Sequence, residues 1–281
     1  MKILFIGDIV GGIGRAAVKK ILPRLRKKYN PDIVIANVEN LAHGKGVTEA
    51  TLREMREAGI NYFTGGNHIF AKKNYPELLN DPSNNLLRPA NYPPGTAGAG
   101  DMLITVNPHK TGSPRFDAAG KTGQKNILLV NLMGRVFFRE HLDCPFRAFD
   151  AILKKYETKG VAAVIVDFHA EATSEKNALR WYADGRAAAV LGTHTHVPIA
   201  DEDVSAGGTA YITDVGGIMA RYSVLGVDKD IIIKNFISQV PLAHELPDTG
   251  VTEFNAVLVT INTKKKTATT IKRIRETVAI G

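Results

Sequence analysis

The sequence predicts an α/β fold in which two mixed β-sheets stack face to face and helices cover both outer faces, a four-layer α/β/β/α sandwich. In the first two thirds of the chain, apolar runs typical of strands alternate with helical segments. Several of these runs are apolar at every position, which is typical of strands buried on both faces. Toward the C-terminus strands outnumber helices, and two stacked sheets would explain that excess.

The expected elements follow from the periodicity of apolar residues. Strands are predicted at 2–7, 32–38, 60–64, 102–106, 126–132, 161–168, 187–192, 209–213, 255–262 and 267–274. Helices are predicted near 15–29, 48–58 and 174–184. The segment "NTKKKT" supplies a polar turn for a last hairpin. Residues 107–125 have no periodicity and are expected to form an inserted, exposed loop. With no repeat or linker, we expect a single domain over residues 1–281.

Composition limits the class of protein. With 281 residues, 44% apolar and 23% charged, the chain is typical of a soluble globular protein. No apolar stretch approaches the roughly 18 to 20 residues of a membrane span, so no membrane association is predicted. Cys144 is the only cysteine, which excludes a disulfide framework and a thiolate-rich metal site. A cytoplasmic location is the default expectation.

The net charge of +8 favours anionic partners such as nucleotides, RNA or phosphates. Much of the excess lies in "KKILPRLRKKYN" and "NTKKKTATTIKRIR". Neither segment has the interleaved aromatic residues that single-strand binding uses, so both are predicted to be solvated faces. RNA binding stays open but is not indicated.

Polar side chains follow five of the expected strands. They are Asp8, the pair Glu39 and Asn40, the pair Asn67 and His68, the pair Asp167 and His169, and the pair His194 and His196. Ligands of open α/β sheets bind at the carboxyl ends of the strands. One such aspartate is often only a helix cap, and the two histidines of "GTHTH" alone fit a surface loop or a metal site. Taken together, the five strand ends are hard to explain as caps.

The side-chain types at these strand ends favour metal ions. Carboxylate, amide and imidazole ligands without thiolate suit Mn, Fe, Zn or Mg. Even seven such groups are more than one ion takes from a protein, whereas two ions bridged by a shared carboxylate would use that many. A two-metal site of this kind ordinarily hydrolyses phosphate esters.

Five sequence blocks resemble the calcineurin-like metallophosphoesterases. They read "GDIVG", "NVEN", "GGNH", "DFHAEATSEK" and "GTHTHVP". The glutamate of the second block and "HAEATSEK" are similar to the YmdB-like branch, the bacterial 2′,3′-cyclic-nucleotide 2′-phosphodiesterase family. The resemblance covers the chain from Lys2 to about Val215.

The resemblance implies a ligand set. One ion would be held by Asp8, Glu39, Asn40 and His196, and the other by Glu39, Asn67, His169 and His194, with Glu39 as the bridge. Iron or manganese is the expected metal, with zinc or magnesium as alternatives. The resemblance also leaves room for a homo-oligomer.

The activity implied is hydrolysis of small phosphodiesters, best of all 2′,3′-cyclic nucleotides to 3′-phosphates, by in-line attack of a metal-bridging hydroxide. His68 would protonate the leaving oxygen, or instead only hydrogen-bond a ligand. Lys45 and Arg221 would form a basic rim for substrate, or instead be ordinary surface charges. The insertion at 107–125 and the divergent segment 218–230 leave substrate preference open.

Other functions remain alternatives at this stage. A metal-dependent phosphatase, or an RNA-linked regulatory protein that keeps the metal site, would have the same ligands. "GGIGRAA" gives Gly12-x-Gly14, which resembles a dinucleotide fingerprint with Glu39 as the ribose-binding acid. A nicotinamide-dependent oxidoreductase would leave the histidines at the strand ends unexplained. Bound metal together with turnover of a phosphodiester would separate these classes.

Overall fold

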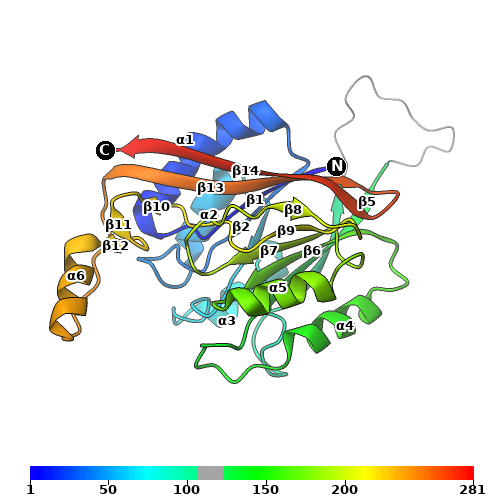
Figure 1. Cartoon of the computed structure of the whole chain (residues 1–281), viewed down its shortest axis with the longest axis horizontal. Helices are drawn as coiled ribbons and strands as arrows, with labels where there is room; N and C mark the ends of the chain where they lie inside the picture. The colour runs from blue at the N-terminus through cyan, green and yellow to red at the C-terminus, as the bar shows by residue number, and fades with distance from the viewer. Residues whose placement is uncertain (107–122) are drawn as a thin grey trace.

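The computed structural model describes residues 1–106 and 123–281, and it confirms the predicted fold class (Figure 1). Two six-stranded sheets, each mixed, account for most of the strands. The expected loop at 107–125 lies largely outside the described residues. The single domain over residues 1–281 stays a prediction.

The first sheet holds the N-terminal strands together with the C-terminal hairpin. Its order is β10-β13-β1-β2-β3, with β14 paired to β13. The parallel pairs are β1–β2 and β2–β3, and β13 runs antiparallel to β1. The strands are β1 (Lys2–Ile6), β2 (Ile33–Asn37), β3 (Tyr62–Thr64), β10 (Met219–Ala220), β13 (Gly250–Asn262) and β14 (Thr267–Ile280). The predicted last hairpin is therefore confirmed.

The second sheet has the order β4-β5-β6-β7-β9-β8. Its central strands β5, β6, β7 and β9 are parallel, and antiparallel strands close both edges. The strands are β4 (Asp101–Val106), β5 (Lys125–Met133), β6 (Val161–His169), β7 (Ala189–Thr193), β8 (Asp203–Val204) and β9 (Ala210–Ile212). A separate small hairpin pairs β11 (Ser223–Val224) with β12 (Val227–Asp228).

Helices pack on the outer face of each sheet. The described helices are α1 (Gly11–Tyr29), α2 (Glu49–Glu57), α3 (Tyr75–Asn80), α4 (Pro145–Lys155), α5 (Thr173–Tyr182) and α6 (Lys229–Ser238), with a 3₁₀ turn at Pro82–Asn84. Apolar residues of α1 and α2 pack against the first sheet, and those of α4 and α5 against the second. Helix α6 extends from the edge of the molecule (Figure 1). In the part of the chain that the structure describes, no helix is long and apolar enough to cross a membrane.

Alternation of side chains along the strands explains the continuously apolar runs. Ile3 and Phe5 of β1 join Ile127 and Leu129 of β5 in the core between the sheets. Leu4 of β1 instead faces the core under the first-sheet helices, because successive strand residues point to opposite faces. Strands with helices on one side and a second sheet on the other therefore need an apolar residue at every position.

Helix α1 begins earlier than the sequence indicated, at Gly11 rather than near Arg15. Gly12 and Gly14 therefore lie in its first turns rather than in a loop. A Cβ on Gly14 would lie 2.5 Å from the carbonyl oxygen of Ile218. Glycine at this position lets the helix pack closely on the segment that follows β9.

Candidate metal centre

The structure gathers the predicted ligands between the carboxyl ends of the two sheets. Asp8, Glu39, Asn40 and Asn67 follow strands β1, β2 and β3, whereas His169 is the last residue of β6 and His194 and His196 follow β7. Asp8, Glu39, Asn40 and His169 are each no more than 2% exposed. The parallel order of each set of strands is what brings side chains so far apart in sequence to one place.

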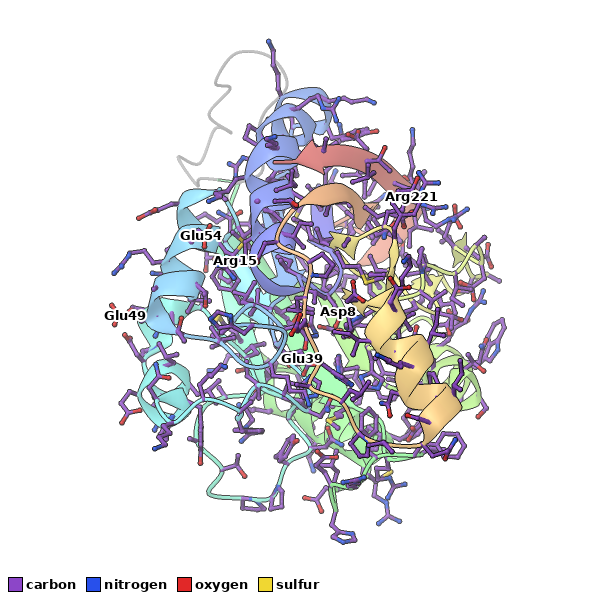
Figure 2. All side chains as sticks on the ribbon, turned by 90° about the vertical axis from the view of Figure 1, so that its left-hand side faces the viewer. Asp8, Arg15, Glu39, Glu49, Glu54 and Arg221 are labelled. Atoms are coloured by element: carbon purple, nitrogen blue, oxygen red, sulfur yellow. The ribbon has the colours of Figure 1, made fainter. Side chains whose placement is uncertain are left out.

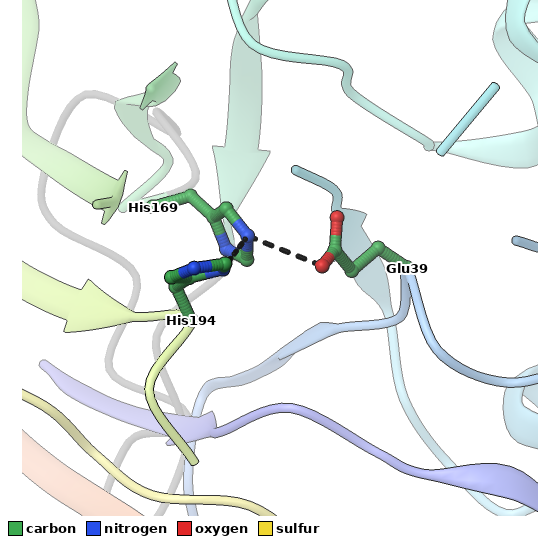
Figure 3. A group of neighbouring side chains, drawn as sticks. All are labelled: Glu39, His169 and His194. Carbon is green, nitrogen blue, oxygen red and sulfur yellow. Dashed lines mark hydrogen bonds and ion pairs between the residues drawn. The ribbon is translucent and has the colours of Figure 1, made fainter. Parts of the chain in front are cut away.

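One group of ligand atoms converges around His169 (Figure 3). Its Nε2 lies 3.1 Å from Glu39 Oε1, 3.1 Å from Asn67 Oδ1 and 3.0 Å from His194 Nδ1. Ligand atoms of Glu39, His169 and His194 all lie within 4.8 Å of one another. Such a cluster of carboxylate and imidazole atoms can hold a metal ion.

A second group of atoms lies around His196. Its Nε2 is 3.2 Å from the side-chain amide of Asn40 and 4.0 Å from Asp8 Oδ1. The Asn40 amide in turn lies 3.5 Å from Glu39 Oε1. Glu39 is therefore in contact with members of both groups.

The surroundings of the Asp8 carboxylate indicate that these residues fit a cation. Its Oδ1 is buried and has no hydrogen-bond partner among the described residues. Burial raises the pKa of this carboxyl, although His196 and His169 act in the opposite direction. A buried carboxylate oxygen without a partner is costly, and a bound cation would remove that cost. The donor set, oxygen and imidazole without thiolate, fits the same cation.

The two imidazoles of the first group have opposite electrostatic environments. Burial alone would lower the pKa of His169, but the carboxylates of Glu39, Asp8 and Asp167 raise it to about 9. Burial and the nearby charge of His169 lower the pKa of His194 to about 2. Burial would raise the pKa of the Glu39 carboxyl, but His169 and His68 hold it well below its usual range. A cation bound here would replace the proton that His169 otherwise carries.

A chain of hydrogen bonds through Nδ1 holds the ring of His169 in place. Thr193 Oγ1 donates to Asp167 Oδ1 at 2.7 Å, so it is free to accept from His169 Nδ1, which lies 2.9 Å away. Asp167 also accepts hydrogen bonds from Thr64 and Asn37. Burial raises the pKa of Asp167 to about 6, although His169 and the two hydroxyls act to lower it. With Nδ1–H directed at Thr193, Nε2 is the nitrogen that faces the other ligands.

His194 has a carboxylate on its far side. Its Nδ1 faces His169, and its Nε2 lies 3.1 Å from Glu171 Oε2. The ring of Phe138 lies against it, with the ring centroids 4.8 Å apart. Sequence analysis gave Glu171 no role, although its place two residues after His169 was a usable signal. A carboxylate of this kind orients a ligand histidine and fixes its tautomer.

His68 lies beside the cluster and opens toward solvent. Its Nδ1 is 2.9 Å from Asn40 Oδ1 and 3.3 Å from Glu39 Oε1, and its side chain is 30% exposed. Its backbone N–H donates to Glu39 Oε2 at 2.8 Å. His68 therefore lies beside the candidate ligands Glu39 and Asn40, and its role stays a prediction.

Two cavities flank the histidines. One, of about 550 Å³, is lined by residues that include Asn40, Lys45, His68 and His196. The other, of about 410 Å³, is lined by Asn67, Phe137, Phe138, Arg139, Glu140, Glu171 and His194. The ligand cluster is therefore accessible from two sides.

The structure brings Lys45 to the site but not Arg221. The Arg221 Nε pairs with Glu253 at 3.5 Å, and its guanidinium lies over the ring of Tyr222. Figure 2 shows Arg221 well away from Asp8 and Glu39. Arg221 begins the turn after β10, and its partner Glu253 lies on the adjacent strand β13, a pairing that sequence alone does not reveal.

The geometry does not support the dinucleotide alternative. The Glu39 carboxylate, which a ribose would need, is turned toward His169 and His68. Gly14 packs against the backbone at Ile218. The Glu39 carboxylate therefore belongs to the histidine cluster, and Gly14 allows helix α1 to pack against the segment at Ile218.

Three known proteins are similar to this chain over nearly its whole length. A protein of Bacillus subtilis (strain 168) named 2′,3′-cyclic-nucleotide 2′-phosphodiesterase is 42% identical over 274 residues, which is 98% of this chain and 96% of the relative. A crystal structure described as a novel phosphatase, from Mycoplasma pneumoniae, has a TM-score of 0.86 at 32% identity and covers 99% of this chain and 93% of its own. A hypothetical protein of Thermus thermophilus has a TM-score of 0.84 at 38% identity, covering 99% of both chains.

A family model described as YmdB-like protein matches residues 4–274. The match extends well beyond Val215, where the resemblance indicated by the sequence ended. The resemblance that those blocks indicated is confirmed, and the chain belongs to the YmdB-like family.

Proposed function

We propose that this protein is a two-metal phosphodiesterase that hydrolyses small phosphodiesters, with 2′,3′-cyclic nucleotides as the best substrates and 3′-phosphates as the products. The observation that carries the proposal is the convergence of two groups of candidate ligand side chains, with Glu39 in contact with both. The name of the Bacillus subtilis relative supports the choice of substrate.

Asp8, Glu39, Asn40 and His196 would hold one cation, and Glu39, Asn67, His169 and His194 the other. Iron or manganese is the expected pair, because the oxygen and imidazole donors suit both, and zinc or magnesium is the alternative. When bound, the two cations would make hydroxide available near neutral pH and neutralise the charge that builds on phosphorus. Glu39 suits the shared position because its Oε1 lies beside members of both groups, 3.1 Å from His169 Nε2 and 3.5 Å from the Asn40 amide nitrogen.

His68 would supply the proton that the departing ribose oxygen needs. Its Nδ1 faces the Asn40 side-chain oxygen, which fixes the ring and leaves Nε2 as the nitrogen that can hold a transferable proton. Its ring is partly exposed in the cavity of about 550 Å³, where a substrate can reach it. A general acid in hydrogen-bond reach of the leaving group contributes about 10²- to 10⁴-fold to the rate.

The two cavities would receive the two sides of the substrate. Lys45, in the cavity with His68, would offset the single negative charge of a cyclic diester. In the other cavity the side chain of Phe137 is 83% exposed, and its backbone φ is 69°. Solvent exposure and a left-handed backbone are both unfavourable for a large apolar residue. Its open ring face would stack on the nucleobase. Leu225 and Val227, from the divergent segment 218–230, line the first cavity and would adjust substrate preference.

A turnover screen tests the proposal. The purified protein, supplied with Mn²⁺, is given phosphomonoesters, linear diesters and cyclic nucleotides, and the products of 2′,3′-cyclic AMP are identified by phosphorus NMR. We expect the cyclic diester to react fastest and to give the 3′-phosphate. A 2′-phosphate product would contradict the bond assignment.

The second candidate is a phosphatase. The crystal structure described as a novel phosphatase, with a TM-score of 0.86, favours it. Rapid hydrolysis of monoesters, with no turnover of diesters by a protein that carries both metals, would establish this alternative.

A further inference from the structure

The segment from Glu171 to Lys176, at the start of α5, reaches three different parts of the site. Glu171 pairs with His194, as described above. Glu175 is buried, and its carboxylate accepts hydrogen bonds from the backbone N–H groups of Arg135 and Val136, which lead to Phe137 and Phe138. Lys176 reaches a third place, the loop that carries the two histidines after β7, through Asp214. This third connection has no evident explanation in the proposed chemistry.

Lys176 and Asp214 form a fully buried ion pair. Both residues are 0% exposed, and Lys176 Nζ lies 2.8 Å from Asp214 Oδ2. Burying two charges costs much of what their attraction returns, so such a pair is weak evidence for a role in stability. Its role is better sought in what the carboxylate holds in place.

Asp214 holds the residue between the two histidine ligands. Its Oδ2 accepts from the backbone N–H of Thr195 at 3.0 Å and from the Thr195 hydroxyl at 2.8 Å. Its Oδ1 accepts from the backbone N–H of Gly216 at 2.8 Å. Together with Lys176, this gives the carboxylate four donors, which hold both of its oxygens in place.

The loop that Asp214 holds has a strained backbone. His194 has a φ of 102° and His196 a φ of 63°, in the left-handed region that residues other than glycine rarely adopt. Such conformations persist only where the surrounding structure enforces them. Thr195, held by both its N–H and its hydroxyl, lies between these two residues.

We propose that Lys176 is a positioning residue of the metal centre, which acts through Asp214 and Thr195 to hold His194 and His196 in their ligating conformations. The lysine is the charged partner of the buried carboxylate that holds Thr195, and without it that carboxylate would be an unpaired buried charge. The inference rests on the proposed function only in that His194 and His196 bind cations.

The first test changes the hydroxyl alone. Thr195→Val removes the hydroxyl at nearly constant shape, Thr195→Ser retains it, and Thr209→Val is the matched control. Thr209 is 0% exposed, whereas Thr195 is partly buried, and the Thr209 hydroxyl donates to the carbonyl of Ala187 at 2.6 Å, before the start of β7 and not at the end that carries the histidines. Metal-free protein is titrated with Co²⁺ by calorimetry, and the visible spectrum of bound Co²⁺ reports the ligand geometry.

We expect Thr195→Val to weaken Co²⁺ binding by about 10- to 100-fold and to change the spectrum, since residues that orient ligands have effects of that size. Thr195→Ser and Thr209→Val should bind Co²⁺ as the unchanged protein does, although Thr209→Val should also lower the melting temperature. Co²⁺ affinity and spectrum unchanged in Thr195→Val would overturn the proposal.

The second test asks whether Lys176 acts through Thr195. Lys176→Met keeps the length of the side chain and removes its charge, and it should weaken Co²⁺ binding as Thr195→Val does. The double variant should lose little more than either single variant, because the two changes interrupt the same connection. Losses that simply multiply would show that Lys176 acts by another route. If Lys176→Met does not fold, Lys176→Gln, which also removes the charge but keeps a hydrogen-bond donor beside Asp214, takes its place with the same expected loss and the same test against Thr195→Val.

Failure of the proposed function would look different. If Co²⁺ binding responds as expected but no phosphodiester is turned over, the activity is wrong and the positioning role stands. If cyclic nucleotides are hydrolysed while Thr195→Val binds Co²⁺ normally, the positioning role is wrong and the activity stands.

Discussion

The two sheets make different contributions to the site. The first sheet supplies the oxygen side, Asp8, Glu39, Asn40 and Asn67, and the second supplies the imidazole side, His169, His194 and His196. On the oxygen side the two carboxylates carry the negative charge, and Asp8 has a buried oxygen without a partner among the residues that the structure describes. The imidazoles carry no negative charge of their own.

The supports of the two sides differ accordingly. Each histidine of the first group has a buried or nearby carboxylate behind it, Asp167 through Thr193 for His169 and Glu171 for His194. The oxygen ligands instead contact backbone N–H groups, as Glu39 does at His68 and Asp8 at His194. An imidazole can rotate and change tautomer, so it needs an acceptor to fix it, whereas a carboxylate needs donors or cations. The comparison predicts which changes affect one side and which affect both.

Glu39→Gln should have the largest effect, because Glu39 contacts both groups of ligands. Removing its charge should weaken the binding of both cations and lower turnover by more than about 100-fold, above the range seen for residues that only orient ligands. The measurement is metal content after gel filtration, together with turnover of 2′,3′-cyclic AMP. Glu49→Gln is the control, since Glu49 is an exposed glutamate of α2 whose side chain is 76% exposed. Full retention of both metals by Glu39→Gln would show that Glu39 does not bridge the two groups.

His194→Ala and His196→Ala should each lose mainly one cation, and not the same one. His194 lies with His169 and Asn67, whereas His196 lies with Asn40 and Asp8. Stoichiometry by elemental analysis should fall from two toward one in each variant. Loss of both cations from each variant would mean that the three histidines act as one unit, and it would contradict the division of the ligands into two groups.

Metal affinity should rise with pH because His169 must lose a proton to bind a cation. Its pKa in the metal-free protein is raised to about 9, so near neutral pH it is protonated, whereas His194, with a pKa lowered to about 2, is already neutral. The imidazoles of this group should therefore release about one proton, and affinity should increase about tenfold for each pH unit below 9. Calorimetry in buffers with different ionisation enthalpies counts the protons. Affinity that does not change between pH 6 and 8 would contradict this assignment.

The sequence indicated the candidate ligands because each lies at or next to the end of its strand, where local patterns are informative. A polar residue after a continuously apolar run is visible without knowing the fold, and parallel strands then bring such residues together. The supports were not visible in the same way. Thr195 and Asp214 interact through a contact that depends on how β7 and β9 pack, and Lys176 comes from a helix that precedes both strands.

Dependence on tertiary contacts also explains which predictions were wrong or missing. Arg221 was a basic residue with no local indication that Glu253 of a neighbouring strand would pair with it. Helix α4 and helix α6 were not predicted, and α6 leaves Phe236 and Ile237 largely exposed, which no amphipathic pattern would favour. Tertiary context decides these features.

The smallest predicted effect concerns the cavity on the imidazole side. Phe137→Ala should raise the KM for 2′,3′-cyclic AMP about fivefold and leave kcat nearly unchanged, because stacking on a base holds the substrate and the transition state equally. Fivefold is at the low end for base stacking, which is reasonable for a ring that is 83% exposed. The KM for ribose 2′,3′-cyclic phosphate, which has no base, should not change.

Phe236→Ala provides the control for this last prediction, since Phe236 is also exposed, at 73%, but lies on α6 and does not line either cavity beside the ligands. An unchanged KM for the nucleotide in Phe137→Ala would place the base in the other cavity, beside Lys45 and His68. The base would then bind on the side of Asn40 and His196, and the cavity at Phe137 would be left for the other substituent of a linear diester. Measuring the same variant with a dinucleotide would then show a raised KM where the cyclic nucleotide shows none.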